Sequence, residues 1–317
     1  MSTTVRQAFG LRISCRPPIP GAPAPAESQQ PLVWIEAGVV EERPDELHEP
    51  VWRTMIDGER VWVHRMADGA LVMAFGRHGS FRISGDGTRV TCAPRPDAEP
   101  ERWRRFLLDT VLWCTALLHG HVAMHAGAVV GRLGAVAIIA GTGGGKTSLT
   151  AELVRRGAAL LSDDILVLTS DGAVIGHPAP HVMSLDAGSS STVRWALGRP
   201  LATLDGQLWF EVARAAGAPT RLAAVILLER LEGLSAAAVE LIDRPFLRLM
   251  AHTVAIPGLP VSHVRRRYDV LADLVETVPV WSLKAPAALP PTVLADLIEG
   301  AIAAQDGAIP GRLWDES

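Results

Sequence analysis

Hydrophobic and polar residues alternate in short segments over the first hundred positions of the chain. The segments are separated by turn sequences such as Asp68-Gly69 and Gly85-Asp86-Gly87, which favour tight reversals between antiparallel strands. This pattern predicts a β-rich antiparallel meander. Its expected strands are Leu32–Ala37, Val51–Met55, Val61–Arg65, Ala70–Phe75, Ser80–Ile83 and Arg89–Cys92.

The pattern becomes helical after a linker rich in Pro, Asp and Glu over residues 93–100. Apolar positions recur every three or four residues from Glu101 to Leu118, which predicts an amphipathic helix. Trp103 and Trp113 lie in this helix, where we expect them to be core residues rather than platforms for a ligand.

From His121 onward, continuous apolar runs of the kind found in buried strands alternate with helical patterns, which is typical of α/β proteins. Strands are expected at Ala123–Val130, Ala135–Ile139, Leu160–Leu168, Val174–Ile175, Leu222–Glu229 and Val280–Leu283, and helices at Arg244–His252, Arg266–Val278 and Pro291–Ala304. We therefore predict a β-rich domain over residues 1–96, a connecting helix over 97–120, and an α/β catalytic domain over 121–317. The first domain is a candidate for presenting a substrate.

The composition narrows the class of protein. A chain of 317 residues with 48% hydrophobic and 20% charged residues can bury a substantial core. A net charge of −4 with one dense basic cluster, Arg265–Arg267, argues against nucleic-acid binding. The most apolar helical stretch, Leu107–Leu118, is short of the ~20 residues that a membrane span needs. Three scattered cysteines form neither a disulfide framework nor a metal spacing, so we expect a soluble cytoplasmic protein.

Only two of the thirty basic Lys and Arg residues are lysines, and Lys146 lies in the segment Ala140-Gly-Thr-Gly-Gly-Gly-Lys-Thr147. A lysine in a chain that otherwise uses arginine indicates a position that needs a compact point charge. Contact with the β- and γ-phosphates of a nucleotide has this requirement. The apolar strand before the glycines and the helical pattern after them are the context of a phosphate-binding P-loop. A glycine-rich turn that binds nothing is the alternative. The residues predicted to bind ATP are Gly141, Thr142, Gly143, Gly144, Gly145, Lys146, Thr147 and Ser148.

Two adjacent carboxylates, Asp163 and Asp164, interrupt the apolar segment Leu160–Leu168. A charge in a buried strand costs several kcal/mol unless it is paired or bound to a cation. The pair therefore predicts a strand end where Mg²⁺ is held with the nucleotide, and the hydroxyl of Thr147 would complete the metal shell. Because successive side chains alternate along a strand, the two acids are expected to have different roles. In the alternative interpretation, one caps a turn and the other is solvated.

The spacing of these features resembles the catalytic core of the HPr kinase/phosphorylase family. His125 lies fifteen residues before Ala140, and the two aspartates lie seventeen and eighteen residues after Lys146. The resemblance covers residues 125–164 and implies a P-loop kinase core of the HPr-kinase and PEP-carboxykinase type. It implies that Lys146 contacts the β- and γ-phosphates, that Thr147 and Asp164 bind Mg²⁺, that Asp163 is the general base, and that His125 lies beside the aspartates.

The bifunctional enzymes of that family carry a downstream signature built around Arg-Gly-Leu-Gly, which this chain lacks after Asp164. The difference argues against HPr as the substrate and against the reverse reaction. The remainder looks more like HPr-kinase-related proteins of peptide tailoring, including kinases of lasso-peptide precursors. The similar segments are Phe9–Ser14, Pro18–Gly21, Val225–Arg230 and Val278–Leu283.

Three functions stay open at this stage. The sequence favours an ATP-dependent kinase for a serine of a peptide or small protein, such as a precursor peptide. A small-molecule kinase on the same core and a nucleotide-sensing regulator without transfer activity are the alternatives. Retention of both aspartates argues against the regulator, because sensing needs a metal but no base. The acceptor, the choice between ATP and GTP, and a homo-oligomeric state are left open.

Overall fold

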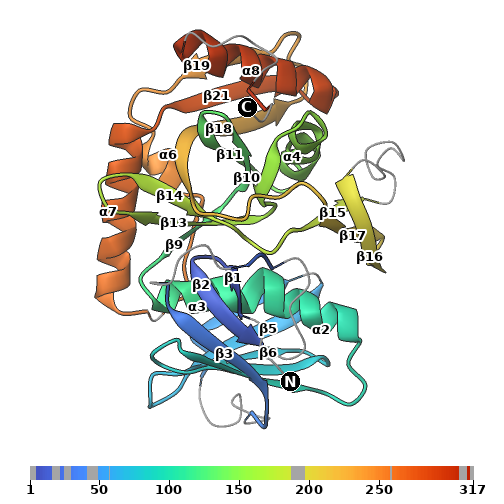
Figure 1. Ribbon diagram of the computed structural model, residues 1–317, viewed down its shortest axis with the longest axis vertical. Coiled ribbons are helices and arrows are strands. Elements are labelled where there is room, and N and C mark those ends of the chain that lie inside the picture. The colour runs from blue at the N-terminus through green and yellow to red at the C-terminus, as the bar shows by residue number, and fades with distance from the viewer. Residues whose placement is uncertain are drawn as a thin grey trace.

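Eight short strands near the N-terminus form one sheet in the computed structural model, which describes residues 5–15, 22–24, 30–40, 49–56, 58–186, 197–257, 259–306 and 313–314. The strands are β1 (Val5–Ala8), β2 (Leu11–Cys15), β3 (Leu32–Ala37), β4 (Trp52–Ile56), β5 (Glu59–Arg65), β6 (Leu71–Phe75), β7 (Gly79–Ile83) and β8 (Arg89–Pro94). This sheet confirms the β-rich N-terminal region (Figure 1, bottom). The predicted similarity at Pro18–Gly21 lies outside the described residues.

The predicted antiparallel meander is only partly correct. Strands β4 to β8 form successive antiparallel pairs, but β3 pairs in parallel with both β8 and β2. Strands β1 and β2 were not predicted, although the alternation of buried Leu11 and Ile13 with Arg12 is a strand signal. A strand with one buried face has the same alternation whichever way its neighbour runs. Its direction therefore cannot be read from the pattern.

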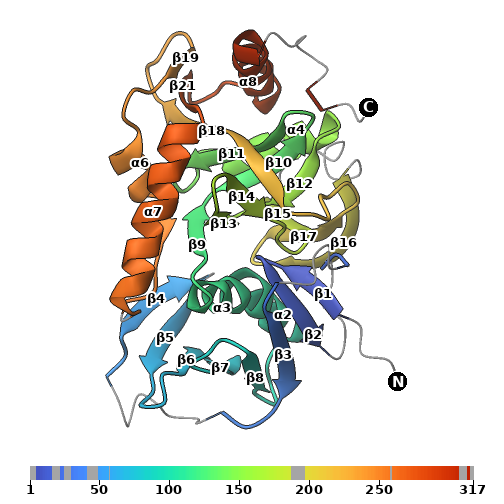
Figure 2. The ribbon, with the colours of Figure 1, turned by 60° about the vertical axis from the view of Figure 1, so that its left-hand side comes forward.

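One helical segment crosses the N-terminal sheet and confirms the helix predicted from Glu101 to Leu118. It comprises α2 (Pro100–Phe106), a π-helical segment η1 (Leu107–Val111) and α3 (Leu112–Leu118). In both ribbon views it lies between the N-terminal sheet and the rest of the chain (Figures 1 and 2). It therefore separates the two parts of the molecule and has one face available to each.

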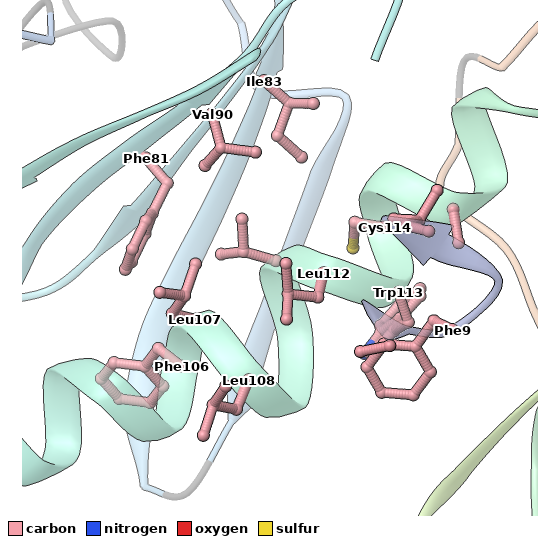
Figure 3. Packing of buried hydrophobic residues seen from close by; sticks show 14 of the residues in the cluster. Phe9, Phe81, Ile83, Val90, Phe106, Leu107, Leu108, Leu112, Trp113 and Cys114 are labelled. Carbon is pink, nitrogen blue, oxygen red and sulfur yellow. The ribbon is translucent and has the colours of Figure 1, made fainter. Parts of the chain in front are cut away.

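The apolar face of this segment packs on the sheet (Figure 3). The ring of Phe106 stacks on Phe75 with 4.4 Å between centroids, and Trp103 stacks on Phe81 at 5.1 Å. Trp113 is buried in the same apolar cluster. The prediction that the two tryptophans belong to the core is confirmed.

A second, mixed sheet lies at the centre of the chain after His121. Its strands are β9 (Val122–His125), β10 (Gly127–Gly131), β11 (Gly134–Ala140), β12 (Ala159–Ser162), β13 (Ile165–Ser170), β14 (Val174–His177), β18 (Thr220–Leu231), β19 (Ala238–Leu241), β20 (Thr253–Val254) and β21 (Val280–Pro286). Strands β11, β18 and β21 run parallel side by side, and the other pairs are antiparallel.

Helices cover both faces of this second sheet. They are α4 (Lys146–Arg155), α6 (Phe246–Met250), α7 (Val261–Thr277) and α8 (Pro291–Asp306). Neighbouring residues of β11 belong to different apolar clusters: Ile138 packs with α4 and α8, whereas Ile139 packs with α7. Figure 2 shows α7 on one side of the sheet and α4 on the other. Burial on both faces explains why these strands have continuous apolar runs, and the mixed α/β class is confirmed.

Two strands predicted as continuous are each divided in two. The segment Ala123–Val130 is split between β9 and β10, and Leu160–Leu168 is split between β12 and β13 by a bend at Asp163 and Asp164. The buried hydroxyl of Ser162 donates a hydrogen bond to the carbonyl oxygen of Ile165 at 2.5 Å, which closes this bend. The second break lies at the strand end that the two aspartates predicted, whereas the apolar residues on both sides of Ala126 give no signal for the first.

A third, small sheet was not predicted. It consists of β15 (Val182–Asp186), β17 (Gln207–Val212) and β16 (Gly198–Leu204), in that order. The hairpin between β16 and β17 turns at Asp205 and Gly206, which both have positive φ. The helix predicted at Arg266–Val278 begins earlier, at Val261, because Pro260 stands at its N-terminal cap. The helix predicted at Arg244–His252 is shorter, at Phe246–Met250.

No helix of the described residues is long and apolar enough to cross a membrane. The three cysteines are free thiols, and Cys92 and Cys114 are buried. Burial raises the pKa of Cys92 to about 12 and that of Cys114 well above its usual value. Because the thiolate is the reactive form, these two thiols are chemically inert in the folded chain.

The turn between β1 and β2 packs against two histidines. The rings of His121 and His177 stack with 5.4 Å between centroids. A Cβ added to Gly10 would lie 2.8 Å from Cε1 of His121, so the turn needs glycine at this point. Burial lowers the pKa of His121 to about 3, reinforced by His177 and His119, and burial lowers the pKa of His177 to about 4.

These two histidines are expected to make the fold sensitive to acid. Below pH 6.5 the unfolded chain binds a proton on each ring, whereas the folded chain stays neutral down to the lowered pKa values. Stability should therefore fall between pH 6.5 and 4 by up to about 1.4 kcal/mol per pH unit for each histidine. Urea denaturation at several pH values measures this slope, and His177→Gln should reduce it. An unchanged slope in that variant would contradict the assignment.

Candidate active site

A glycine-rich loop joins the end of β11 to the start of α4. Gly143 and Gly145 have φ of 73° and 87°, a conformation that costs glycine little and other residues more. The N–H of Gly144 donates to the carbonyl oxygen of Gly141 at 2.8 Å, which tightens the loop. The loop therefore ends at a helix N-terminus, where backbone N–H groups attract anions.

Lys146 is the first residue of α4, and its side chain is only 8% exposed. Its Nζ donates to Oδ1 of Asp164 at 2.6 Å and to the backbone oxygen of Asp163 at 2.9 Å. Gly127 makes this approach feasible, because a Cβ there would lie 2.6 Å from Oγ1 of Thr150 and 3.0 Å from the backbone oxygen of Asp163. Strand β10 thus brings the helix and the aspartate bend together.

Asp163 points toward β15 and the glycine loop. Its Oδ2 accepts a hydrogen bond from the N–H of Ser184 at 3.1 Å, while Oδ1 is buried without a partner among the described residues. Burial raises the pKa of Asp163 to about 6, and Asp164 adds to this, whereas Lys146, Ser184 and the hydroxyl of Thr147 act in the opposite direction. This carboxylate therefore titrates close to neutral pH.

Asp164 has a different environment, since its side chain is 58% exposed. Burial acts to raise the pKa of Asp164, but the charge and the hydrogen bond of Lys146 outweigh that effect, so this pKa is lowered. Nδ1 of His125 lies 3.6 Å from its Oδ1. The pKa of His125 is itself lowered, first by burial, so the ring is mainly neutral at pH 7. One aspartate thus stays ionised and the other is poised to exchange a proton.

All residues predicted to act at the site line one cleft of about 480 Å³. They are His125, Gly141, Thr142, Gly143, Gly144, Gly145, Lys146, Thr147, Ser148, Asp163 and Asp164. The structure therefore brings together segments that are up to 39 residues apart, from 125 to 164.

The opposite wall of the cleft was missed by the sequence analysis. It contains residues of the N-terminal sheet, of the α2–η1 segment and of the small sheet: Phe9, Ile56, Arg105, Asp109, Thr110, Ser184, Gln207 and Trp209. The one available signal was Asp109, an acid inside the apolar stretch Leu107–Leu118. Its position within the π-helical segment η1 is typical of functional sites, but π-helical geometry cannot be read from sequence.

Other candidates lie away from the aspartates. His119 contacts the backbone oxygen of Gly87 at 3.0 Å, and His121 belongs to the buried pair described above, so both are structural as predicted. Glu229, which ends an apolar run, accepts a hydrogen bond from Nη2 of Arg248 at 2.9 Å. This exposed pair makes Glu229 unsuitable as a metal carboxylate of the cleft.

The oxygen atoms beside the glycine loop suit a hard cation. Thr147 offers a hydroxyl, and Asp163 and Asp164 offer carboxylates, which are the ligand types that Mg²⁺ prefers. Among the described residues, no group of three or more His, Cys, Asp or Glu side chains could hold a metal by themselves. Mg²⁺ usually takes one or two carboxylates together with substrate phosphates.

Comparisons with known proteins give little guidance. No protein-family model matches the chain, and no curated protein matches it in sequence. Among solved structures, the Hpr(Ser) kinase/phosphatase from Coxiella burnetii aligns with 58% of this chain and 99% of its own length, at 19% sequence identity and a TM-score of 0.32. A similarity this low does not establish a family, so the functional argument depends on the site.

Proposed function

We propose that this chain is an ATP-dependent kinase that transfers the γ-phosphate to a serine hydroxyl of a peptide or small protein. One observation carries the proposal: Lys146 and two adjacent carboxylates with opposite pKa shifts meet in the cleft that the glycine loop lines. The proposal includes the identity of residues 140–147 as a P-loop and a core of the HPr-kinase and PEP-carboxykinase type.

The glycine loop and the N-terminus of α4 would bind the phosphates of ATP. Lys146 would exchange its contact with Asp164 for contacts with the β- and γ-phosphates. Asp164, once released and still ionised because of its low pKa, would hold Mg²⁺ together with Thr147. When bound, Mg²⁺ neutralises the charge of the β- and γ-phosphate oxygens.

Asp163 would act as the general base, because its pKa of about 6 is close to the operating pH. Its carboxylate accepts the proton of the serine hydroxyl as the serine oxygen bonds to the γ-phosphorus. The bond between that phosphorus and the β–γ bridging oxygen breaks, and ADP leaves with the electron pair. His125 would keep Asp164 oriented through their contact.

The acceptor is the least constrained part of the proposal. The N-terminal sheet contributes Phe9 and Ile56 to the cleft, which supports a role of this region in receiving the acceptor. A ribosomal precursor peptide of the lasso type is the narrower form of the proposal, and its support is the sequence resemblance alone.

A radiolabel experiment tests the function directly. The protein is incubated with γ-³²P-ATP, Mg²⁺ and serine-containing peptides, and the label is followed into peptide, small molecules and inorganic phosphate. We expect label on peptide serine. Asp164→Asn should weaken the Mg²⁺ dependence and reduce transfer, whereas Glu229→Gln should retain both, since it alters an exposed ion pair worth about 1 kcal/mol or less.

Each other distribution of label identifies a different function. Label in a metabolite pool would indicate a small-molecule kinase, and nucleotide binding without any transfer would indicate a regulator. Equal losses of Mg²⁺ dependence in Asp164→Asn and Glu229→Gln would contradict the proposed metal site.

A further inference from the structure

A second cavity adjoins the cleft that contains the aspartates. It has a volume of about 380 Å³ and shares Arg105 and Gln207 with the cleft. Its remaining lining residues are Gly58, Glu59, Arg77, Arg102 and Asp205. The two cavities therefore adjoin at these two residues, and together they make a groove that extends from the aspartates outward to α2, the start of β5 and the β16–β17 hairpin.

Arginine side chains are concentrated along this groove. Arg102 and Arg105 are nearly buried, with 7% and 10% of their side chains exposed, although both are charged. Arg105 is close enough to the aspartates to lower the pKa of Asp164. Arg77, Arg102 and Arg105 all act to lower the pKa of Asp205. The groove thus has a row of arginines that begins in the aspartate cleft at Arg105. Each of them is paired with an acid: Arg77 with Glu59, Arg102 with Asp205 and Glu99, and Arg105 with Asp109.

The acids that pair with Arg102 and Arg105 are more exposed than these two arginines, whereas the exposed Arg77 lies 3.8 Å from the less exposed Glu59. Nη2 of Arg102 donates to Oδ1 of Asp205 at 2.5 Å, and 56% of the Asp205 side chain is exposed. Arg105 contacts Asp109 at 3.3 Å and the amide oxygen of Gln207 at 3.4 Å. Ion pairs that water reaches contribute little free energy. An incoming carboxylate can therefore replace Asp205 at modest cost.

We propose that this groove binds an acceptor peptide and that Arg102, with Arg105, holds an acidic group of that peptide while its serine lies at Asp163 and Asp164. The inference rests on the proposed transfer to a peptide serine and adds the chemistry of the acceptor. The groove extends past the cleft into a second cavity, which suits an extended chain. Arginine forks bind carboxylates with two parallel hydrogen bonds, which also selects their orientation.

The test uses matched synthetic peptides with blocked ends and a single serine. Each carries one Glu, placed two to five residues before or after the serine, and each has a partner peptide with Gln at that position. At the preferred spacing, the Glu peptide should have a kcat/KM about 10- to 100-fold above its Gln partner, the range for hydrogen bonds to a charged group. A third peptide with Gln and a free C-terminal carboxylate distinguishes a terminal acid from a side-chain acid.

Three variants separate recognition from a structural role. Arg102→Gln should remove the preference for Glu. Asp205→Asn should increase it, because the competing carboxylate is lost while asparagine tolerates the positive φ of 49° at this position. If Arg102 and Asp205 only fastened the hairpin, both variants would change in the same direction. Arg199→Gln is the control, since Arg199 lies on the same hairpin but pairs with Glu211 outside both cavities.

Anisotropy of fluorescein-labelled peptides, measured without nucleotide, tests peptide binding in the groove independently of phosphate transfer. Selective binding of Glu peptides that Arg102→Gln abolishes would support the groove even if no phosphate were transferred, in which case the proposed function would fail alone. Transfer with equal kcat/KM for Glu and Gln peptides would retain the kinase and overturn the groove. A preference that survives Arg102→Gln would also overturn it.

Discussion

Lys146→Ala is expected to weaken nucleotide binding by about 10- to 100-fold, the range for lost hydrogen bonds between charged groups. Phosphoryl transfer should fall further, by about 10²–10³-fold, since a preorganised positive charge at the transferred group is removed. The structure adds a second cause. Lys146 lowers the pKa of both Asp163 and Asp164, so both acids should become harder to ionise in the variant. Calorimetric titration with a non-hydrolysable ATP analogue and a transfer assay measure the two effects.

Two lysine controls make this expectation specific. Lys146→Arg keeps the positive charge but replaces a compact ammonium with a larger planar guanidinium. Because the lysine side chain is only 8% exposed, this variant should also bind nucleotide more weakly. Lys284→Ala removes the only other lysine of the chain, which is exposed on β21, and should leave binding unchanged. Wild-type nucleotide affinity in Lys146→Ala would refute the proposed P-loop.

Asp163→Asn is expected to retain ATP and Mg²⁺ binding but to reduce transfer by about 10²–10⁴-fold, the usual contribution of a general base. The amide oxygen of asparagine can still accept the hydrogen bond from the N–H of Ser184, so the bend should persist. In the wild-type protein the rate should fall as pH drops through about 6, because the base becomes protonated. The residual rate of the variant should lack this acidic limb.

The same substitution should stabilise the fold. The folded-state pKa of Asp163, about 6, lies above the usual aspartate value of 3.8, so at pH 7 the ionised carboxylate opposes folding. Removing that charge should raise the free energy of unfolding by about 1–3 kcal/mol at pH 7, an effect that disappears below pH 4. Denaturant titrations at both pH values test the sign. A wild-type transfer rate in Asp163→Asn would assign the base elsewhere, and a loss of stability would attribute the lost activity to misfolding.

Local patterns predicted most of the elements. Strong local signals mark the alternating segments of the N-terminal region, the helix from Glu101 to Leu118 and the strand–glycine–helix unit around Lys146. In each of them, buried positions repeat every two to four residues, so a short stretch of sequence is enough to recognise the element. Less local features were missed. The parallel pairing of β3 with β8 joins residues more than fifty positions apart, and the sheet of β15, β16 and β17 has no clear alternation.

The candidate site likewise has one part that the sequence predicted and one part that it did not. The fixed spacing of His125, Lys146 and the two aspartates predicted one half of the cleft, since these residues lie in consecutive elements. The other half depends on α2 and η1, which approach the glycine loop only through the packing of the N-terminal sheet. Arg105 and Gln207 are about a hundred residues apart, and nothing in the neighbourhood of either indicates the other.

The sequence alone determined which groups are available for the proposed chemistry, because the glycine loop, Lys146 and the paired acids are recognised locally, by residue type and spacing. The tertiary structure decided how those groups differ. It placed the aspartates at a bend rather than along a strand, left Asp164 more exposed than Asp163, and brought Arg105 into the same cleft. Burial and electrostatic contact arise from residues distant in sequence, so only the folded chain gives the two aspartates opposite pKa shifts and shapes the cleft around them.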